Sequence, residues 1–84
     1  MAEVAVIARV ECRSEGSAEQ RPVAVWLGSV RVEVEHIVSD SVVGSDEAGG
    51  VNRRSVRVTL SDGRYLILER DLPDGDWRAY RDQG

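Results

Sequence analysis

The strongest constraint in this sequence is a period-two alternation of apolar and polar residues, which recurs along most of the chain. Valine supplies many of the apolar positions: there are fourteen valines and no phenylalanine. Successive side chains of a strand point to opposite faces, and branched side chains pack well on a pleated surface, so this pattern predicts strands and not helices. The predicted strands are residues 3–11, Pro22–Leu27, Val30–Val38, Arg54–Leu60, Arg64–Arg70 and Asp76–Arg81.

Short turns between these segments predict which strands pair. Gly28–Ser29 is typical of a two-residue hairpin loop, and Ser61–Gly63 is typical of a three-residue loop with a bulge. Asp71–Gly75 forms a further turn, in which Pro73 and Gly75 have their usual roles. The expected pairs are Leu27 with Val30, Val25 with Val32, Val23 with Val34, Val58 with Leu66, Val56 with Leu68, Leu68 with Trp77 and Leu66 with Ala79. This register places Trp77 in the core.

The chain has 84 residues, which is the size of one small domain, 1–84. Five consecutive strands with tight turns predict a meander over residues 22–81 that curls into a small barrel. Residues 39–52 contain three glycines and predict a long flexible loop. The expected fold is therefore an all-β barrel with an extra N-terminal strand.

That N-terminal strand carries apolar side chains on both faces. Val4, Val6, Ala8 and Val10 lie on one face, and Ala5 and Ile7 lie on the other. An unpaired strand of this kind would be an aggregation hazard, so it has to pair. It can add to its own barrel or to the barrel of a second chain, in which case it would make a dimer.

The composition excludes several classes of function. All eleven basic residues are arginine, so chemistry that needs a lysine amine is excluded. The formal charge of −4 disfavours a general nucleic-acid coat protein. No apolar run approaches a membrane span, and the N-terminus lacks the features of a signal peptide. We expect a cytoplasmic protein with no membrane association.

Metal, cofactor and catalytic sites are not expected. Cys12 and His36 are the single cysteine and histidine, and structural zinc sites need more such ligands. Cys12 is interpreted as an ordinary thiol, and His36 as a residue at the edge of the core. Asp71, Asp74 and Asp76 do not have the spacing of a calcium loop and are interpreted as turn residues. We therefore predict no cofactor and no enzymatic activity.

The most distinctive group of polar and aromatic residues lies on the outer face of the second half of the meander. This candidate binding face consists of Arg57, Tyr65, Ile67, Arg78 and Tyr80. Small barrels bind single-stranded nucleic acid by stacking bases on aromatic side chains within a basic groove. Tyrosine and arginine are equally typical of protein contacts. The face could also be covered by the N-terminal strand.

Residues 21–81 resemble a family of small uncharacterised bacterial β-barrel domains. The resemblance rests on an Arg-Pro strand, a glycine turn, a V-R-V-x-L-x-D-G-R hairpin and a final D-G-x-W segment. The matching positions are Arg21, Pro22, Gly28, Val56, Val58, Leu60, Asp62, Gly63, Arg64, Asp74, Gly75 and Trp77. The resemblance implies an SH3-like barrel, found alone or beside DNA-repair polymerase-related proteins, and it implies no catalytic residues.

The sequence thus predicts a non-catalytic binding or accessory module that acts through protein contact, including self-association as a homodimer. The alternative is weak binding of single-stranded nucleic acid through the Arg/Tyr face, with a link to DNA repair. The identity of a protein partner is left open.

Overall fold

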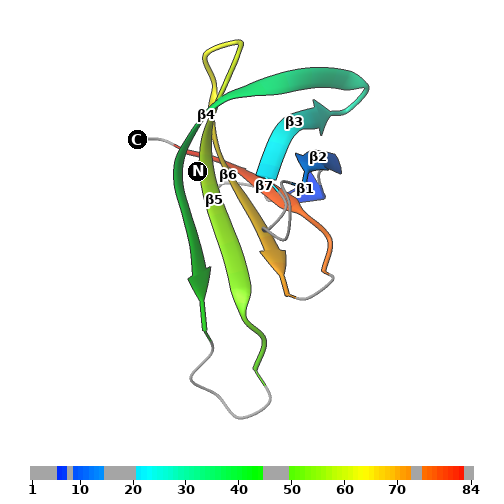
Figure 1. Cartoon of the computed structure of the whole chain (residues 1–84). Helices are drawn as coiled ribbons and strands as arrows, with labels where there is room; N and C mark the ends of the chain where they lie inside the picture. The colour runs from blue at the N-terminus through cyan, green and yellow to red at the C-terminus, as the bar shows by residue number, and fades with distance from the viewer. Residues whose placement is uncertain (1–5, 8, 15–20, 45–49, 73–74, 83–84) are drawn as a thin grey trace.

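The computed structural model describes residues 6–7, 9–14, 21–44, 50–72 and 75–82, which form an all-β domain without any helix. The strands, drawn in Figure 1, are β1 (Val6–Ile7), β2 (Arg9–Arg13), β3 (Arg21–Leu27), β4 (Val30–Val43), β5 (Arg53–Leu60), β6 (Tyr65–Asp71) and β7 (Arg78–Arg81). The predicted all-β class is confirmed. None of the described segments forms a helix with the length and apolar character of a membrane span.

The strands form one antiparallel sheet in the order β1-β7-β6-β5-β4-β3-β2. Strands β3 to β7 follow one another as a meander, as predicted. Strands β1 and β2 are neighbours in the chain, yet they pair with β7 and β3 at opposite ends of the sheet. The sheet therefore curls until both ends meet at the N-terminal segment, and the result is barrel-like (Figure 1).

The N-terminal strand differs from its prediction. The expected single strand over residues 3–11 is divided into β1 and β2, and residues 3–5 and 8 lie outside the described part of the chain. Val6 pairs with Ala79, whereas Val10 pairs with Val25. Both strands pair within their own chain.

The predicted loop over residues 39–52 is also wrong in its first part. Strand β4 continues to Val43, and Ser39–Val43 pairs with Arg53–Arg57 of β5. The register of β4 shifts between Val34 and His36 and again between Ile37 and Ser39. Each shift changes which residues face the core, so the simple alternation that identifies a strand is lost after Val34.

The final hairpin has a register that differs by two residues from the predicted one. Leu68 pairs with Ala79, and Leu66 pairs with Arg81. The cause is a wider turn than expected: the Gly75 amide donates to the Asp71 carbonyl at 2.7 Å, and pairing in β7 begins only at Arg78. Trp77 precedes the strand and is nevertheless buried, as predicted, with 8% of its surface exposed.

The other predicted hairpins are largely confirmed. Gly28 (φ 65°) and Gly63 (φ 93°) adopt the left-handed conformation that their turns require. The observed pairs include Leu27 with Val30, Val25 with Val32, Val58 with Leu66 and Val56 with Leu68. The β3–β4 pairing ends at Ala24 and Glu33, so the expected pair of Val23 with Val34 does not form. Val30 is exposed and not part of the core.

The core lies inside the curl, between the two halves of the sheet. Its buried members come from β3 to β7 and from the segment before β7: Val25, Val32, Val56, Val58, Leu60, Leu66, Leu68, Trp77 and Ala79. Val10 and Cys12 of β2 pack against them. The N-terminal segment therefore contributes side chains to the core as well as strand pairing.

Candidate functional site

The predicted Arg/Tyr face is brought together on β5, β6 and β7. The register places Arg57 opposite Ile67, and Ile67 opposite Tyr80, so these three residues form one row across the sheet. Tyr65 lies opposite Thr59, and Arg78 lies opposite Glu69. Tyr65 and Arg57 are exposed, whereas the other three residues are half-buried.

The two arginines of this face are held by carboxylates of the same chain. Arg57 donates to both carboxylate oxygens of Asp82, at 3.2 and 3.0 Å. Arg78 donates to Asp71 at 3.3 Å, and Arg53 donates to the same oxygen at 3.1 Å. The hydrogen bond from Arg53, and secondly that from Arg78, holds the pKa of Asp71 below its usual range. A phosphate would have to compete with these carboxylates.

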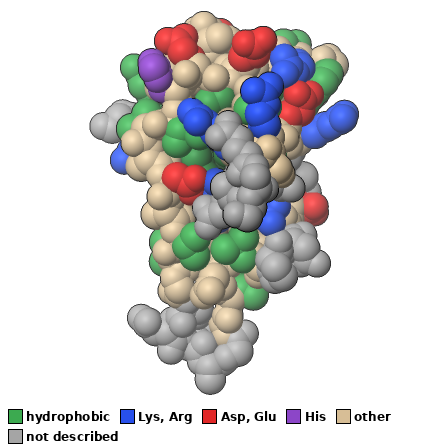
Figure 2. All heavy atoms as spheres, in the orientation of Figure 1, with side chains coloured by type: hydrophobic (Ala, Val, Ile, Leu, Met, Phe, Trp, Pro, Cys, Tyr) green, Lys and Arg blue, Asp and Glu red, His purple; other side chains and the backbone are tan. Residues whose placement is uncertain are grey.

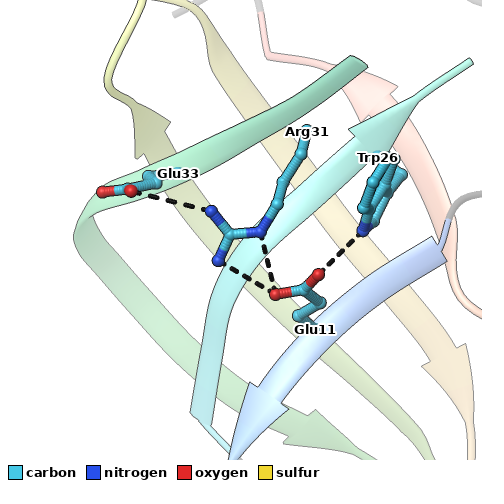
Figure 3. Close-up of polar contacts among 4 residues, drawn as sticks. All are labelled: Glu11, Trp26, Arg31 and Glu33. Atoms are coloured by element: carbon cyan, nitrogen blue, oxygen red, sulfur yellow. Dashed lines mark hydrogen bonds and ion pairs between the residues drawn. The ribbon is translucent and has the colours of Figure 1, made fainter. Parts of the chain in front are cut away.

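A separate cluster around a carboxylate joins β2, β3 and β4 at the other end of the sheet (Figure 3). Glu11 of β2 accepts from the Trp26 indole at 2.9 Å and from Arg31 Nε at 3.0 Å. Arg31 also lies 3.6 Å from Glu33. The bond from Arg31, followed by that from Trp26, lowers the pKa of Glu11. These hydrogen bonds link β2 to β3 and β4, and this structural role explains why charged residues lie here.

Arg54 is buried at the margin of the core, and Asp40 binds it through two hydrogen bonds. The Nε and Nη2 atoms of Arg54 donate to the two carboxylate oxygens at 3.0 and 2.6 Å. Arg54 and Arg70 each lie over the Trp77 ring, 6.0 and 5.5 Å from its centre. Cys12 lies near both guanidinium groups, but burial is the largest influence and raises the pKa of its thiol. The thiol is therefore half-buried and packs against the core.

His36 is exposed, which corrects its expected place at the edge of the core. The register shift after Val34 moves it away from the face of the preceding valines, so that it pairs with Thr59. Figure 2 shows the histidine at the molecular surface. Among the described residues, no group of three or more histidine, cysteine, aspartate or glutamate side chains could hold a metal ion.

The feature that the sequence did not predict is an open strand edge. We call residues 36–43 of β4 the open edge, because within the described ranges only β5 pairs with them. In Figure 1 this part of β4 runs along the outside of the sheet, away from β3. Val38, Val42 and Val43 on this strand are 62%, 50% and 59% exposed. Hydrophobic side chains also reach the surface in the lower half of Figure 2, where β4 and β5 lie.

A groove of about 250 Å³ opens beside the first residues of this edge, where β3 and β4 separate. Pro22, Val23, Val34 and Ile37 form its apolar part, and Arg13, Arg21 and Glu35 are its charged residues. Arg13 and Arg21 lie directly opposite each other on β2 and β3. Neither forms an ion pair with a carboxylate in the described part of the chain.

The sequence contained a signal for the open edge, but a weak one. Val42 and Val43 lie within the segment Ser39–Val43, whose serines and aspartate make it resemble a loop. The groove requires residues from three strands, and its position depends on where the β3–β4 pairing ends.

Comparison of the chain with protein-family models, curated proteins and solved structures finds no match.

Proposed function

We propose that this protein is a non-catalytic binding module that contacts another protein by adding an extended segment of that protein to the open edge of β4. The observation that carries this proposal is the side of residues 36–43 with which no strand in the described part of the chain pairs. Backbone amides and carbonyls on such an edge form hydrogen bonds readily with an added strand. The segment Ser39–Val43 pairs regularly with β5, so its outer side offers an uninterrupted template.

The side chains of the open edge support this proposal. Proteins usually protect edge strands with lysine, proline, β-bulges or inward-pointing charges. The register shifts of β4 end at Ser39, so Ser39–Val43 pairs with β5 without a bulge. The open edge has no lysine or proline, and its aspartate, Asp40, is engaged by Arg54. Val38, Val42 and Val43 instead present apolar surface that a partner strand would cover.

The other predicted routes to binding have less support. Self-association by exchange of the N-terminal strand would need a strand that β1 and β2 already provide within their own chain. Nucleic-acid binding through the Arg/Tyr face, with its link to DNA repair, would use arginines that Asp82 and Asp71 already hold. An SH3-like assignment and a cytoplasmic location stay part of the proposal, on the basis of the meander and of the single cysteine.

The test is a selection of peptides of about ten residues, the upper length of a strand, from a random library on the immobilised full chain. Val38→Lys blocks the open edge, and Val30→Lys is the matched control, because Val30 has a similar exposure (58% against 62%) on the same strand. We expect selected peptides to lose affinity about tenfold or more on Val38→Lys, in the way that lysine protects natural edges. Val30→Lys should bind like the original protein.

Hydrogen exchange locates the bound peptide on the protein independently of the variants. Amides of residues 36–43 that face away from β5 should exchange more slowly when a selected peptide is bound. If no peptide is enriched, or if Val38→Lys binds as well as Val30→Lys, the proposed function is wrong.

A further inference from the structure

We infer that the segment added to the open edge is acidic, and that Arg13 and Arg21 bind one of its aspartate or glutamate side chains. This inference rests on the proposed function, because it concerns the partner of the same edge. It is carried by the groove at the beginning of that edge and by the two arginines that line it.

The groove is continuous with the open edge. Val34, Glu35 and Ile37 line the groove, and residues 36–43 form the edge, so both belong to the same stretch of β4. The pairing between β3 and β4 ends at Glu33, and from there the two strands diverge. An extended segment that pairs with the edge can therefore continue alongside β4 into the space that β3 leaves.

The lining of the groove exposes more polar than apolar surface, because its apolar residues are largely covered by the protein itself. Pro22 is fully buried, and Val34 and Ile37 are half-buried and pack against the core. Side chains of an extended segment alternate between two sides. One acidic residue can therefore point into the groove, close to the arginines, while its neighbours point elsewhere.

Arg13 and Arg21 supply the charge complementarity. Directly opposite residues on neighbouring strands have Cβ atoms about 4.5–5.5 Å apart, and like charges in such a pair repel each other. A carboxylate placed between two guanidinium groups removes this repulsion and forms charge-assisted hydrogen bonds. By contrast, Arg31, Arg53, Arg54, Arg57, Arg64 and Arg78 already have carboxylate partners within the described part of the chain.

Glu35 limits the charge that the groove accepts. Among the described residues that line the groove, two arginines and one glutamate sum to a charge of +1, on a chain of net charge −4. A single acidic side chain is matched to it, whereas a strongly acidic segment would be repelled by the rest of the protein. A polypeptide fits better than a nucleic acid, because only a polypeptide has amides that pair with the strand edge.

The experiment is a double-mutant cycle that compares the affinities of peptide variants for the original chain and for arginine variants. Peptides selected on the full chain are synthesised with each Asp or Glu in turn replaced by Asn or Gln, and their affinity is measured by fluorescence anisotropy. One such replacement should weaken binding about tenfold, as expected for the loss of a hydrogen bond between charged groups. The same replacement should have no effect on Arg13→Gln/Arg21→Gln.

The matched control is Arg64→Gln/Arg81→Gln, which removes two exposed arginines elsewhere and changes the net charge equally. It should retain the preference for the acidic peptide. The measurement on the original chain needs no protein variant, so it stays informative even if a variant fails to fold.

The outcomes separate this inference from the proposed function. If peptides bind at the open edge but show no acidic preference, or if the control variant loses that preference equally, the acidic partner is wrong and the proposed function stands. If nothing binds at the edge, both are wrong. If sedimentation shows a dimer that Val38→Lys dissociates, a second copy occupies the edge and the acidic partner is wrong.

Discussion

Arg54 places a positive charge at the margin of a core made of valine, leucine and tryptophan. Its side chain is 8% exposed, whereas that of its partner Asp40 is 32% exposed. A buried charge is tolerated when it is paired and hydrogen-bonded, and the loss of one partner is costly. The pair also explains why β4 extends past Ser39, because Asp40 has to lie beside β5 to reach Arg54.

We expect Asp40→Asn to lower the free energy of unfolding by about 2 kcal/mol, which is less than for a fully buried pair because Asp40 is partly exposed. Urea unfolding followed by tryptophan fluorescence measures the loss. Asp62→Asn is the control: Asp62 is about as exposed as Asp40, but its partner Arg64 is exposed, and the loss should be smaller. Equal losses in both variants would contradict the structural role of the Arg54–Asp40 pair.

The lowered pKa values of three carboxyl groups imply that the stability of the fold depends on pH. Bonds from arginines lower the pKa of Glu11, Asp62 and Asp71 in the folded protein. A group with a lowered folded pKa stabilises the fold above its unfolded pKa, and this contribution is lost as the pH falls through the folded value. Stability should therefore decrease below about pH 4, where these groups begin to protonate in the unfolded chain.

Thermal melts between neutral and acidic pH test this expectation. Glu11→Gln should reduce the acid-induced decrease, since it removes one of the three groups. An unchanged melting temperature on acidification would show that these ion pairs contribute nothing.

At the scale of elements, the N-terminal segment closes the sheet. Strand β1 covers the edge of β7, and β2 covers the edge of β3. Val10 and Cys12 also pack against the core, and Glu11 bonds to Trp26 and Arg31. Removal of this segment therefore exposes two strand edges and part of a small core.

We expect a truncated chain that begins at Ser14 to lose more than about 3 kcal/mol, a large share of the stability of a domain of this size. Circular dichroism melts measure the loss, and a synthetic peptide of residues 1–13 added to the truncated chain should restore part of it. A truncated chain that is folded and equally stable would show that the N-terminal segment is dispensable to the barrel.

At the scale of the whole molecule, the distribution of charge bears on nucleic-acid binding. The chain carries 15 acidic and 11 basic residues, and the arginines of the Arg/Tyr face are paired with acids. We expect a labelled single-stranded oligonucleotide to bind more weakly than about 100 μM at physiological salt, the weak limit of non-specific binding. Titrations at low and moderate salt test this.

The same titration should show little difference between the original chain and Arg57→Ala/Arg78→Ala. Tighter binding that weakens steeply with salt, and that this variant loses, would instead favour the nucleic-acid function.

The sequence by itself determined the all-β class, the meander and the turns at Gly28 and Gly63, because these depend on local alternation and on backbone conformations that favour glycine. It also placed Arg57, Tyr65 and Ile67 on one face, since the alternation in β5 and β6 is regular. Only the tertiary structure decided the rest. The N-terminal strand is divided because β7 and β3, at opposite ends of the sheet, each pair with a part of it. Strand β4 continues through a segment that resembles a loop, and there Asp40 pairs with Arg54. The open edge and its groove exist because β3 leaves β4 after Glu33, and no local pattern records where two strands separate.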